Sequence, residues 1–193
     1  MNNVFLSLVL VDPNANCDLK HLLNLLVKKL QKISTQFEII VVENILYESR
    51  VDLLKEISSS DTVKNITVLC LSSASNFQTS AWAGVENSLG DFVCIFNPAN
   101  DDVDQIEQLF NKSTEGYDIV YGNDVNATKS SLSYRLLSFV FHGIYKFING
   151  FSIERQPTTF KVLSRRIINY IGQFKQPLIK FRYIDSNSNI AVK

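Results

Sequence analysis

The sequence has no long hydrophobic run, and it contains few cysteines, prolines and glycines. No apolar stretch approaches the roughly 18 residues that a membrane-spanning helix needs. Only three of its 193 residues are cysteines, and none is spaced from a histidine as a zinc site requires. With four prolines and seven glycines, the chain shows no low-complexity tract and no internal repeat. These absences exclude a membrane-spanning chain, a zinc-binding module and a repeat protein.

The chain also lacks an excess of either charge, because 19 basic residues balance 19 acidic residues. We therefore expect no nucleic-acid partner and no general attraction to an anionic membrane. Hydrophobic residues make up 46% of the chain, which suits a single globular domain with a substantial core. The amino terminus has no basic segment before an apolar stretch, so we expect no signal peptide. These features favour a cytoplasmic protein, at most peripheral at the inner face of the membrane.

Two of the three cysteines, Cys70 and Cys94, lie in apolar runs that are typical of buried strands. We expect both to be buried free thiols that pack as small hydrophobic side chains in a reducing compartment. The two histidines, His21 and His142, lie far apart on helical patterns. We expect surface or packing positions for both of them.

Apolar strands alternate with amphipathic helices along the first two thirds of the chain. The predicted strands are Val4–Val11, Phe37–Val42, Ile66–Leu71, Phe92–Phe96 and Tyr117–Tyr121. The predicted helices cover about 18–33, 51–57, 78–88 and 102–112. We expect Gly90 to end the third helix in a left-handed conformation, and Asp101 or Asp102 to cap the fourth. The alternation predicts an α/β fold with a mostly parallel central sheet flanked by helices.

The loops that follow the predicted strands should meet at one edge of the sheet. Right-handed crossovers place the carboxyl ends of parallel strands together, and such sheets bind ligands at that edge. The loops concerned are 12–16, 43–48, 72–76 and 97–102. We therefore expect these four loops to line a single crevice.

The sequence changes character after Asn123. Residues 124–133 are polar, and 132–148 predicts a long helix that is rich in aromatic residues. This helix either packs across the sheet edge or contacts a membrane surface or a partner. The second half of the chain is basic through Arg135, Lys146, Arg155, Lys161, Arg165, Arg166, Lys175, Lys180 and Arg182.

Six segments, in a characteristic order and spacing, carry a family resemblance. They are Leu8–Val11 with Asn14, Phe37–Asn44, Ser75–Phe77 with Ala81–Val85, Leu89–Phe96, Glu115–Gly122 and Thr159–Arg166. Together they resemble the family-2 glycosyltransferases of the GT-A fold, most closely the dolichyl- or polyprenyl-phosphate sugar synthases. The resemblance implies one GT-A-like domain over 1–193. Within it, 1–123 would be the nucleotide-binding half and 124–193 the acceptor-side half.

The resemblance implies transfer of a sugar from a nucleotide-sugar donor in envelope polysaccharide synthesis. The acceptor would be a lipid phosphate or a glycan. In active members, an Asp-x-Asp after the fourth strand binds manganese or magnesium, which stabilises the departing diphosphate. By position, the nucleotide would contact Val11, Asn14, Glu43, Asn76 and Asn97. Arg165 would contact a phosphate group.

Most acids of the family's site are replaced in this sequence. Asn97-Pro98-Ala99 stands where the Asp-x-Asp is expected, and Thr159 stands at the acceptor-side acid. Glu43 is the surviving acid after the second strand, and Asp102 is the remaining candidate metal ligand, with helix capping as its alternative role. At four further places this chain differs from the family. Ala15 stands where the family has an acid, Ile45-Leu46 where it has a Gly-Ser pair, Ser75 where it has an arginine and Gln78 where it has a glycine.

These replacements leave the function open between different classes. The chain is either a glycosyltransferase or a catalytically impaired relative that binds or regulates a partner such as an active paralogue. Loss of a metal pair would remove several kcal/mol of transition-state stabilisation, which slows transfer by orders of magnitude. A third alternative is a peripheral membrane module that uses 132–148. Binding of UDP- and GDP-sugars, with and without manganese, separates these hypotheses.

Overall fold

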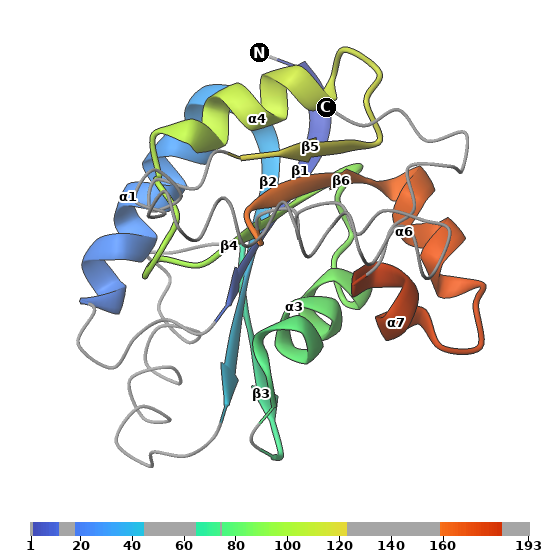
Figure 1. Ribbon diagram of the computed structural model, residues 1–193. Coiled ribbons are helices and arrows are strands. Elements are labelled where there is room, and N and C mark those ends of the chain that lie inside the picture. The colour runs from blue at the N-terminus through green and yellow to red at the C-terminus, as the bar shows by residue number, and fades with distance from the viewer. Residues whose placement is uncertain (1, 12–17, 45–64, 74, 123–158, 183–193) are drawn as a thin grey trace, which may run out of the picture.

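A six-stranded sheet with helices on both faces organises the computed structural model of the chain (Figure 1). The structure describes residues 2–11, 18–44, 65–73, 75–122 and 159–182. Several features expected from the sequence lie outside these residues: Asn14, Ala15, Ile45-Leu46, the helix at 51–57, His142 and the aromatic helix at 132–148.

The strands follow the order β3-β2-β1-β4-β6-β5 across the sheet. They are β1 (Asn2–Val11), β2 (Ser34–Asn44), β3 (Ile66–Leu71), β4 (Phe92–Phe96), β5 (Ile119–Tyr121) and β6 (Lys161–Ser164). β1 to β4 are parallel, and β6 runs antiparallel between β4 and β5. The predicted α/β fold with a mostly parallel sheet is therefore confirmed. The antiparallel strand β6 has only four residues, too few to give a periodic signal.

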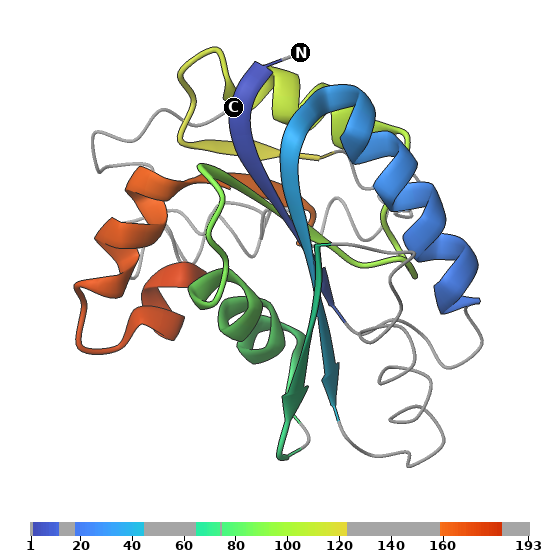
Figure 2. The ribbon, with the colours of Figure 1, turned by 180° about the vertical axis from the view of Figure 1, so that it is seen from behind.

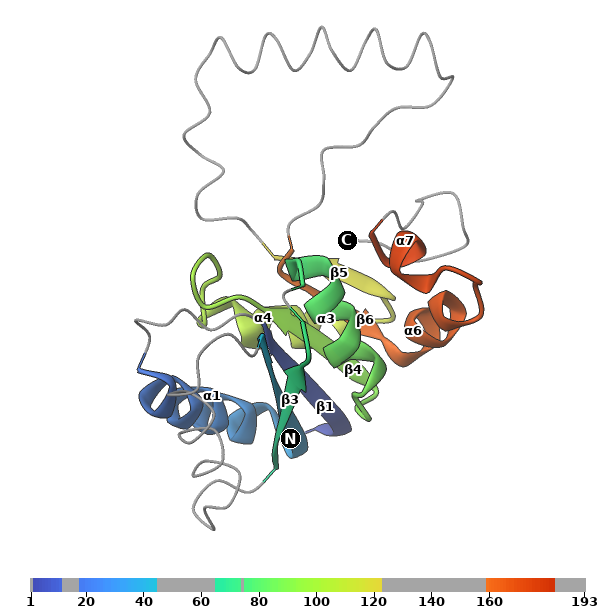
Figure 3. The ribbon, with the colours of Figure 1, turned by 90° about the horizontal axis from the view of Figure 1, so that it is seen from below.

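Helices cover both faces of the sheet (Figures 1 and 2). One face carries α1 (Leu19–Ile33) and α4 (Gln105–Ser113). The other carries α3 (Phe77–Glu86), α6 (Arg165–Gly172) and α7 (Pro177–Arg182), which lie beside one another in Figure 3. In the described part of the chain, no helix combines the length and the apolar character needed to cross a membrane.

Two separate apolar clusters fill the space between the sheet and its helices. Successive residues of a strand point to opposite faces. Leu8 and Leu10 of β1 therefore pack toward α1, whereas Val9 and Val11 pack toward α3. All four side chains are fully buried. This double burial explains why β1 is a continuous apolar run.

β3 lies at the end of the described sheet, and its position corrects the expectation that Cys70 is buried. Cys70 is exposed, whereas Cys94 in the central strand β4 is fully buried. Both cysteines lie in apolar runs, but only β4 has a strand on either side. Burial, with a smaller contribution from Asp101, raises the pKa of the Cys94 thiol well above its ordinary value. Cys94 therefore stays protonated and packs as a small apolar side chain.

The expected left-handed glycine at the end of α3 is also wrong. α3 ends at Glu86, and the positive-φ residues do not include Gly90. Packing requires the glycine instead, because a Cβ atom there would lie 2.6 Å from the Ser7 backbone nitrogen. The turn after α3 therefore lies directly against β1.

A small polar network fixes this turn to the amino-terminal edge of the sheet. The Ser7 hydroxyl donates to Glu38 Oε1 at 2.6 Å. The N–H of Leu89 donates to the same Glu38 oxygen at 2.6 Å, and the N–H of Gly90 donates to Ser7 Oγ at 2.8 Å. These bonds join β1, β2 and the segment that enters β4, so the buried hydroxyl of Ser7 is satisfied.

A second polar contact joins β5 to the end of β6. Asp118 is buried and accepts hydrogen bonds from Ser164 Oγ at 2.7 Å and from Arg166 Nε at 2.9 Å. Its backbone carbonyl accepts the N–H of Ser164 at 2.8 Å. Because a buried carboxylate is costly unless it is paired, these contacts hold the start of α6 against the sheet.

Gly84 allows α3 to lie close to β1 and β2. A Cβ atom there would lie 2.3 Å from Val9 Cγ1 and 2.8 Å from Val42 Cγ2. We expect Gly84→Ala to lower the free energy of unfolding by about 1–3 kcal/mol, because the added methyl overpacks this interface. Gly172→Ala, whose Cβ would meet no atom within 4 Å, is the matched control and should change stability by less than about 1 kcal/mol. Urea unfolding measures both, and equal effects would contradict the packing argument.

Candidate functional site

The carboxyl ends of the parallel strands meet at one edge of the sheet. The register pairs Val11 with Val42 and Leu10 with Phe96. From β1 the chain goes to β2 and β3 on one side and then returns to β4 on the other side of β1. The strand order therefore switches between β1 and β4. Open α/β sheets bind ligands outside the carboxyl ends of their strands at such a switch point, so this edge is the candidate site.

Val11 and Glu43, two predicted nucleotide contacts, end neighbouring strands at this edge. Val11 is the last residue of β1 and is fully buried on the side of α3. Glu43 lies one residue before the end of β2 and is only 8% exposed. Carboxylates are rarely buried so deeply unless they are paired. The structure therefore places an acid at this edge, and its contact with a nucleotide stays a prediction.

The residues after β4 form a closed turn. Asn97 Oδ1 accepts the N–H of Ala99 at 2.9 Å, and Asp101 Oδ2 accepts the N–H of Asn97 at 2.6 Å. The side chains at the position of the family's metal motif thus bind the loop's own backbone. Such Asx-type contacts stabilise turns.

Asp102 has a similar local role ahead of α4. Its Oδ1 accepts the N–H of Asp104 at 2.8 Å. The N-cap of α4 is Asp104, which makes no side-chain capping hydrogen bond, so the expected cap at Asp101 or Asp102 is wrong. Asp104 pairs with Lys29 of α1, and this hydrogen-bonded ammonium lowers the pKa of the Asp104 carboxyl. The turn is therefore fixed both internally and to α1.

The described donor groups do not fit a divalent metal. Magnesium and manganese prefer several oxygen ligands, including carboxylates. Within the described ranges, no group of three or more acidic, histidine or cysteine side chains is arranged so that it could hold a metal ion. Asn97 contributes a neutral amide, and Asp102 uses one oxygen to close its turn. The chemistry of this donor set argues against a metal clamp between Asn97 and Asp102.

Asn76 and Thr159 each lie just before an element near this edge. Asn76 caps α3, and its Oδ1 accepts the N–H and the hydroxyl of Thr79 at 3.0 and 3.1 Å. Thr159 lies two residues before Lys161, which pairs with Ile95 near the end of β4. A threonine hydroxyl carries no negative charge at neutral pH. Position 159 therefore cannot supply the carboxylate that the family places there.

Arg165 lies at the opposite edge of the sheet. It follows Ser164, which pairs with Phe92, the first residue of β4. Its guanidinium donates to the Gly90 carbonyl at 2.9 and 2.6 Å and to Ser88 Oγ at 3.1 Å. At about 3.3 Å per residue, β4 separates this edge from the carboxyl edge by roughly 16 Å. These hydrogen bonds hold the turn before β4, and the predicted phosphate contact of Arg165 stays a prediction.

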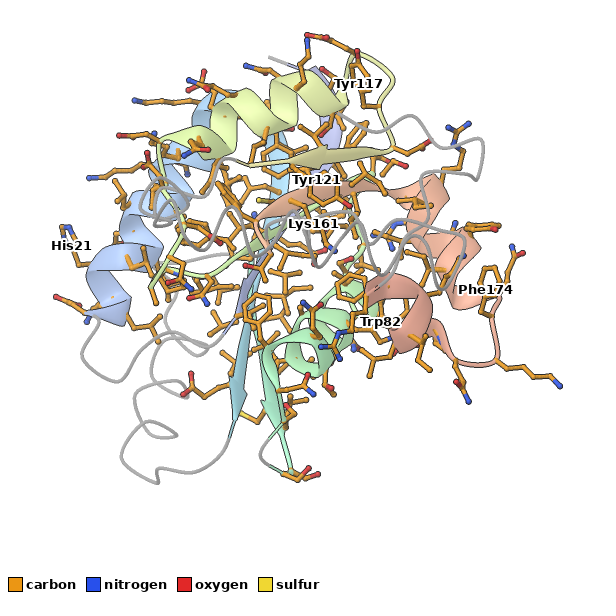
Figure 4. All side chains as sticks on the ribbon, in the orientation of Figure 1. His21, Trp82, Tyr117, Tyr121, Lys161 and Phe174 are labelled. Atoms are coloured by element: carbon orange, nitrogen blue, oxygen red, sulfur yellow. The ribbon has the colours of Figure 1, made fainter. Side chains whose placement is uncertain are left out.

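Lys161 is a buried cation at the carboxyl edge. The sequence indicates only that it belongs to the basic second half of the chain. It is 6% exposed and lies in β6 between Ile95 of β4 and Tyr121 of β5. Its Nζ lies 4.4 Å from the centroid of the Phe181 ring in α7, a cation–π distance. Figure 4 shows Lys161 between Tyr121 and Trp82, on the side of the sheet that carries α3 and α7.

Burial of Lys161 is costly because its surroundings are apolar. Burial lowers the pKa of the Lys161 amine to about 8, and among the described residues no acidic neighbour offsets this effect. The ammonium form still predominates at pH 7. Strongly perturbed, unneutralised groups at a ligand-binding edge are typical of functional residues. The one signal in the sequence was a charged residue within the short, otherwise apolar run Phe160–Leu163.

Comparisons with known proteins give matches among solved structures only. No protein-family model matches the sequence, and a search of the curated proteins finds no match. Glucosyl-3-phosphoglycerate synthase from Mycobacterium tuberculosis, in complex with Mn2+, UDP and glucosyl-3-phosphoglycerate, is 12% identical with a TM-score of 0.57. The match covers 85% of this chain and 58% of that chain. The complex of that protein with Mn2+ and UDP-glucose is 9% identical with a TM-score of 0.54, covering 85% and 57%.

These similarities show that the chain has the fold of GT-A glycosyltransferases, as the sequence resemblance implied. The identities are too low to show more than the fold. The chain spans somewhat more than half the length of the solved structures that it matches. The narrower resemblance to dolichyl- or polyprenyl-phosphate sugar synthases stays a prediction.

Arg165 should be important for stability and not for nucleotide binding. We expect Arg165→Met to lower the free energy of unfolding by about 1–3 kcal/mol, because the Gly90 carbonyl and Ser88 lose a charged donor. Its affinity for UDP should equal that of the wild type, because the guanidinium lies at the opposite edge. Urea unfolding and calorimetric titration measure the two effects, with Lys175→Met as an exposed control. A stably folded Arg165→Met protein with much weaker UDP binding would instead support the phosphate contact.

Lys161 should destabilise the fold at neutral pH. Above about pH 10.5 the amine is neutral in both the folded and the unfolded chain. As the pH is lowered from about 10.5 to 8, only the unfolded chain binds a proton, so the free energy of unfolding falls. Below pH 8 the amine is protonated in both states, and the free-energy cost of burying its charge is constant. We expect Lys161→Met to raise the free energy of unfolding at pH 7 by up to about 3 kcal/mol, and the gain should shrink toward pH 10.

Denaturant unfolding of wild type and Lys161→Met at pH 7 and pH 10 tests this expectation. Among the described residues, Tyr121 pairs with Lys161, and α7, which contacts Lys161 through Phe181, carries Lys180 and Arg182; all three are present in both proteins. Lys175→Met, at an exposed site, should show no such difference. A loss of stability in Lys161→Met at pH 7 would contradict the desolvation argument.

Proposed function

We propose that this protein binds a nucleoside diphosphate sugar at the carboxyl edge between β1 and β4 and acts in glycosyl transfer. The main support is the switch in strand order at this edge, in a fold shared with glucosyl-3-phosphoglycerate synthase. Solved complexes of that synthase contain UDP-glucose and UDP. Because the ligand position in open α/β sheets follows from topology, the same edge is the expected donor site here.

In this proposal, the ends of β1 and β2 hold the nucleoside. Glu43 accepts hydrogen bonds from ribose hydroxyls or from the base, and its burial strengthens such bonds. Val11 supplies an apolar contact at the end of β1. Asn76 and Asn97 offer neutral amides near the same edge. The family position of Asn14 implies a third.

A divalent metal is the least supported part of the family mechanism. Solved complexes of the synthase contain Mn2+ or Mg2+. A bound metal would stabilise the negative charge that develops on a leaving diphosphate. The described residues of this chain, including Asp102, lack the gathered carboxylates that would hold it. We therefore assign no step of the reaction to a metal.

The acceptor is proposed on resemblance, as a lipid phosphate or a glycan of envelope polysaccharide synthesis. Phosphoglyceric acid occupies the complexes of the synthase, which shows that the fold also accommodates a small phosphorylated acid. Contact with a membrane through 132–148 is part of the same proposal, because a lipid-linked acceptor would require it.

A second candidate function is a catalytically impaired glycosyltransferase that binds or regulates an active paralogue. The replacements at Asn97-Pro98-Ala99 and Thr159 favour it, since the metal-binding acids and the acceptor-side acid are both absent there. Loss of either would slow transfer strongly without removing the nucleoside-binding part of the edge.

Titration with UDP-glucose tests the donor site. We expect wild type to bind UDP-glucose or a GDP-sugar, and Glu43→Gln to weaken that binding about tenfold or more, because a bond to a carboxylate contributes about 1.5–3 kcal/mol. Glu107→Gln, an exposed acid of α4, is the matched control and should bind as wild type does. Circular dichroism checks that both variants are folded.

A sugar-transfer assay separates the active glycosyltransferase from the catalytically impaired relative. Release of UDP or GDP in the presence of polyprenyl phosphate or phosphoglycerate would support the transferase. Binding without release, together with capture by an active paralogue, would support the impaired relative. If neither UDP-sugars nor GDP-sugars bind, the proposed donor site is wrong.

A further inference from the structure

A buried diphosphate needs a compensating positive charge. The two phosphates of a nucleoside diphosphate are anionic at neutral pH, and moving them from water to a protein edge is costly without such a charge. Metal ions, arginine or lysine can supply it. In the described part of this chain, no group of three or more acids, histidines or cysteines could hold a metal ion. The described basic side chains are therefore the source of positive charge that this structure offers.

Several described cations already have acidic partners elsewhere. The pairs are Lys29 with Asp104, Lys112 with Glu115 and Arg166 with Asp118. Arg165 lies at the amino-terminal edge, with the Gly90 carbonyl as its acceptor. Each of these side chains makes a structural contact, and Lys29 is neutralised by Asp104 at the end of the turn that follows β4.

Lys161 differs in both location and surroundings. Lys161 pairs with Ile95 of β4. Asn97 comes two residues after Ile95, just beyond the end of β4. The Phe96 and Phe160 rings meet edge to face with centroids 5.8 Å apart, so β4 and β6 remain neighbours up to the beginning of the Asn97 turn. A diagonal neighbour across a strand pair is about 7–8 Å away, which the long lysine side chain can span.

The contacts of Lys161 with described residues hold its amine without neutralising it. The Phe181 ring lies 4.4 Å from Nζ, and Phe181 itself packs against Trp82 of α3 with ring centroids 5.3 Å apart. An aromatic face attracts a cation but leaves its net charge in place. An apolar side chain of similar length would fill the same space without the cost of burying a charge. Packing alone therefore gives no reason for a lysine at this position.

We propose that the ammonium of Lys161 holds the diphosphate of the nucleotide ligand in place of a divalent metal. This inference rests on the proposed function, because it concerns the same edge of the sheet. It predicts that nucleotide binding is independent of metal and depends on one buried lysine. In this arrangement the turn at Asn97-Pro98-Ala99 needs no carboxylate pair, because the cation comes from the neighbouring strand β6.

Calorimetric titration with UDP and with uridine, each in EDTA and in Mn2+, tests the proposal at pH 7. Wild type should bind UDP in EDTA, and Mn2+ should change its affinity by less than about threefold. Lys161→Met should lose about tenfold or more of its affinity for UDP, because a charge-assisted contact is removed, while its affinity for uridine stays unchanged. Lys175→Met is the control and should bind both as wild type does.

The possible failures are distinguishable. UDP binding that requires Mn2+, or UDP binding by Lys161→Met at wild-type affinity in EDTA, overturns the role of Lys161 and leaves the proposed donor site intact. If wild type binds neither UDP nor, in the same titrations, GDP in either condition, both proposals are wrong. Denaturant unfolding of Lys161→Met accompanies the titrations. A folded variant with weaker UDP binding excludes loss of structure as the cause.

Discussion

The pairing of β1 with two parallel neighbours is the constraint on which the rest of the molecule depends. Because β2 and β4 both pair with β1 in parallel, their carboxyl ends meet at one edge, and both faces of β1 must be covered by helices. A buried polar side chain in such a strand must be satisfied locally. Ser7 meets this requirement through Glu38 and the N–H of Gly90, and these contacts also determine where β4 begins.

The strands buried on both faces could be predicted from the sequence, because double burial requires continuous apolar runs. Phe92–Phe96 was predicted with the bounds that the structure has. The order of the strands was not available from such runs, so nothing distinguished the outer position of Cys70 from the central position of Cys94. Gly90 predicted a turn from the sequence. The structure requires glycine there because the backbone lies directly against β1, and such a tertiary contact leaves no local pattern.

The location of the candidate site was more predictable than its chemistry. Loop positions follow from strand direction, so Glu43 and Asn97 were placed at the correct edge. The direction of β6 could not be inferred from four residues, and that direction puts Lys161 at the carboxyl edge and Arg165 at the other. Phe181, which contacts Lys161, lies twenty positions later in the chain. A long-range contact of this kind leaves no local pattern in the sequence.

The exposure of Cys70 has a practical consequence for watching this edge in solution. Cys70 pairs with Glu43 in the β2–β3 register, beside the carboxyl ends of the strands. A thiol-reactive fluorophore would couple there, while Cys94, buried and with its thiolate disfavoured, would resist labelling. In a Cys17→Ser protein, a fluorophore on Cys70 would lie beside Glu43. Its fluorescence would change when a small molecule binds near that carboxylate.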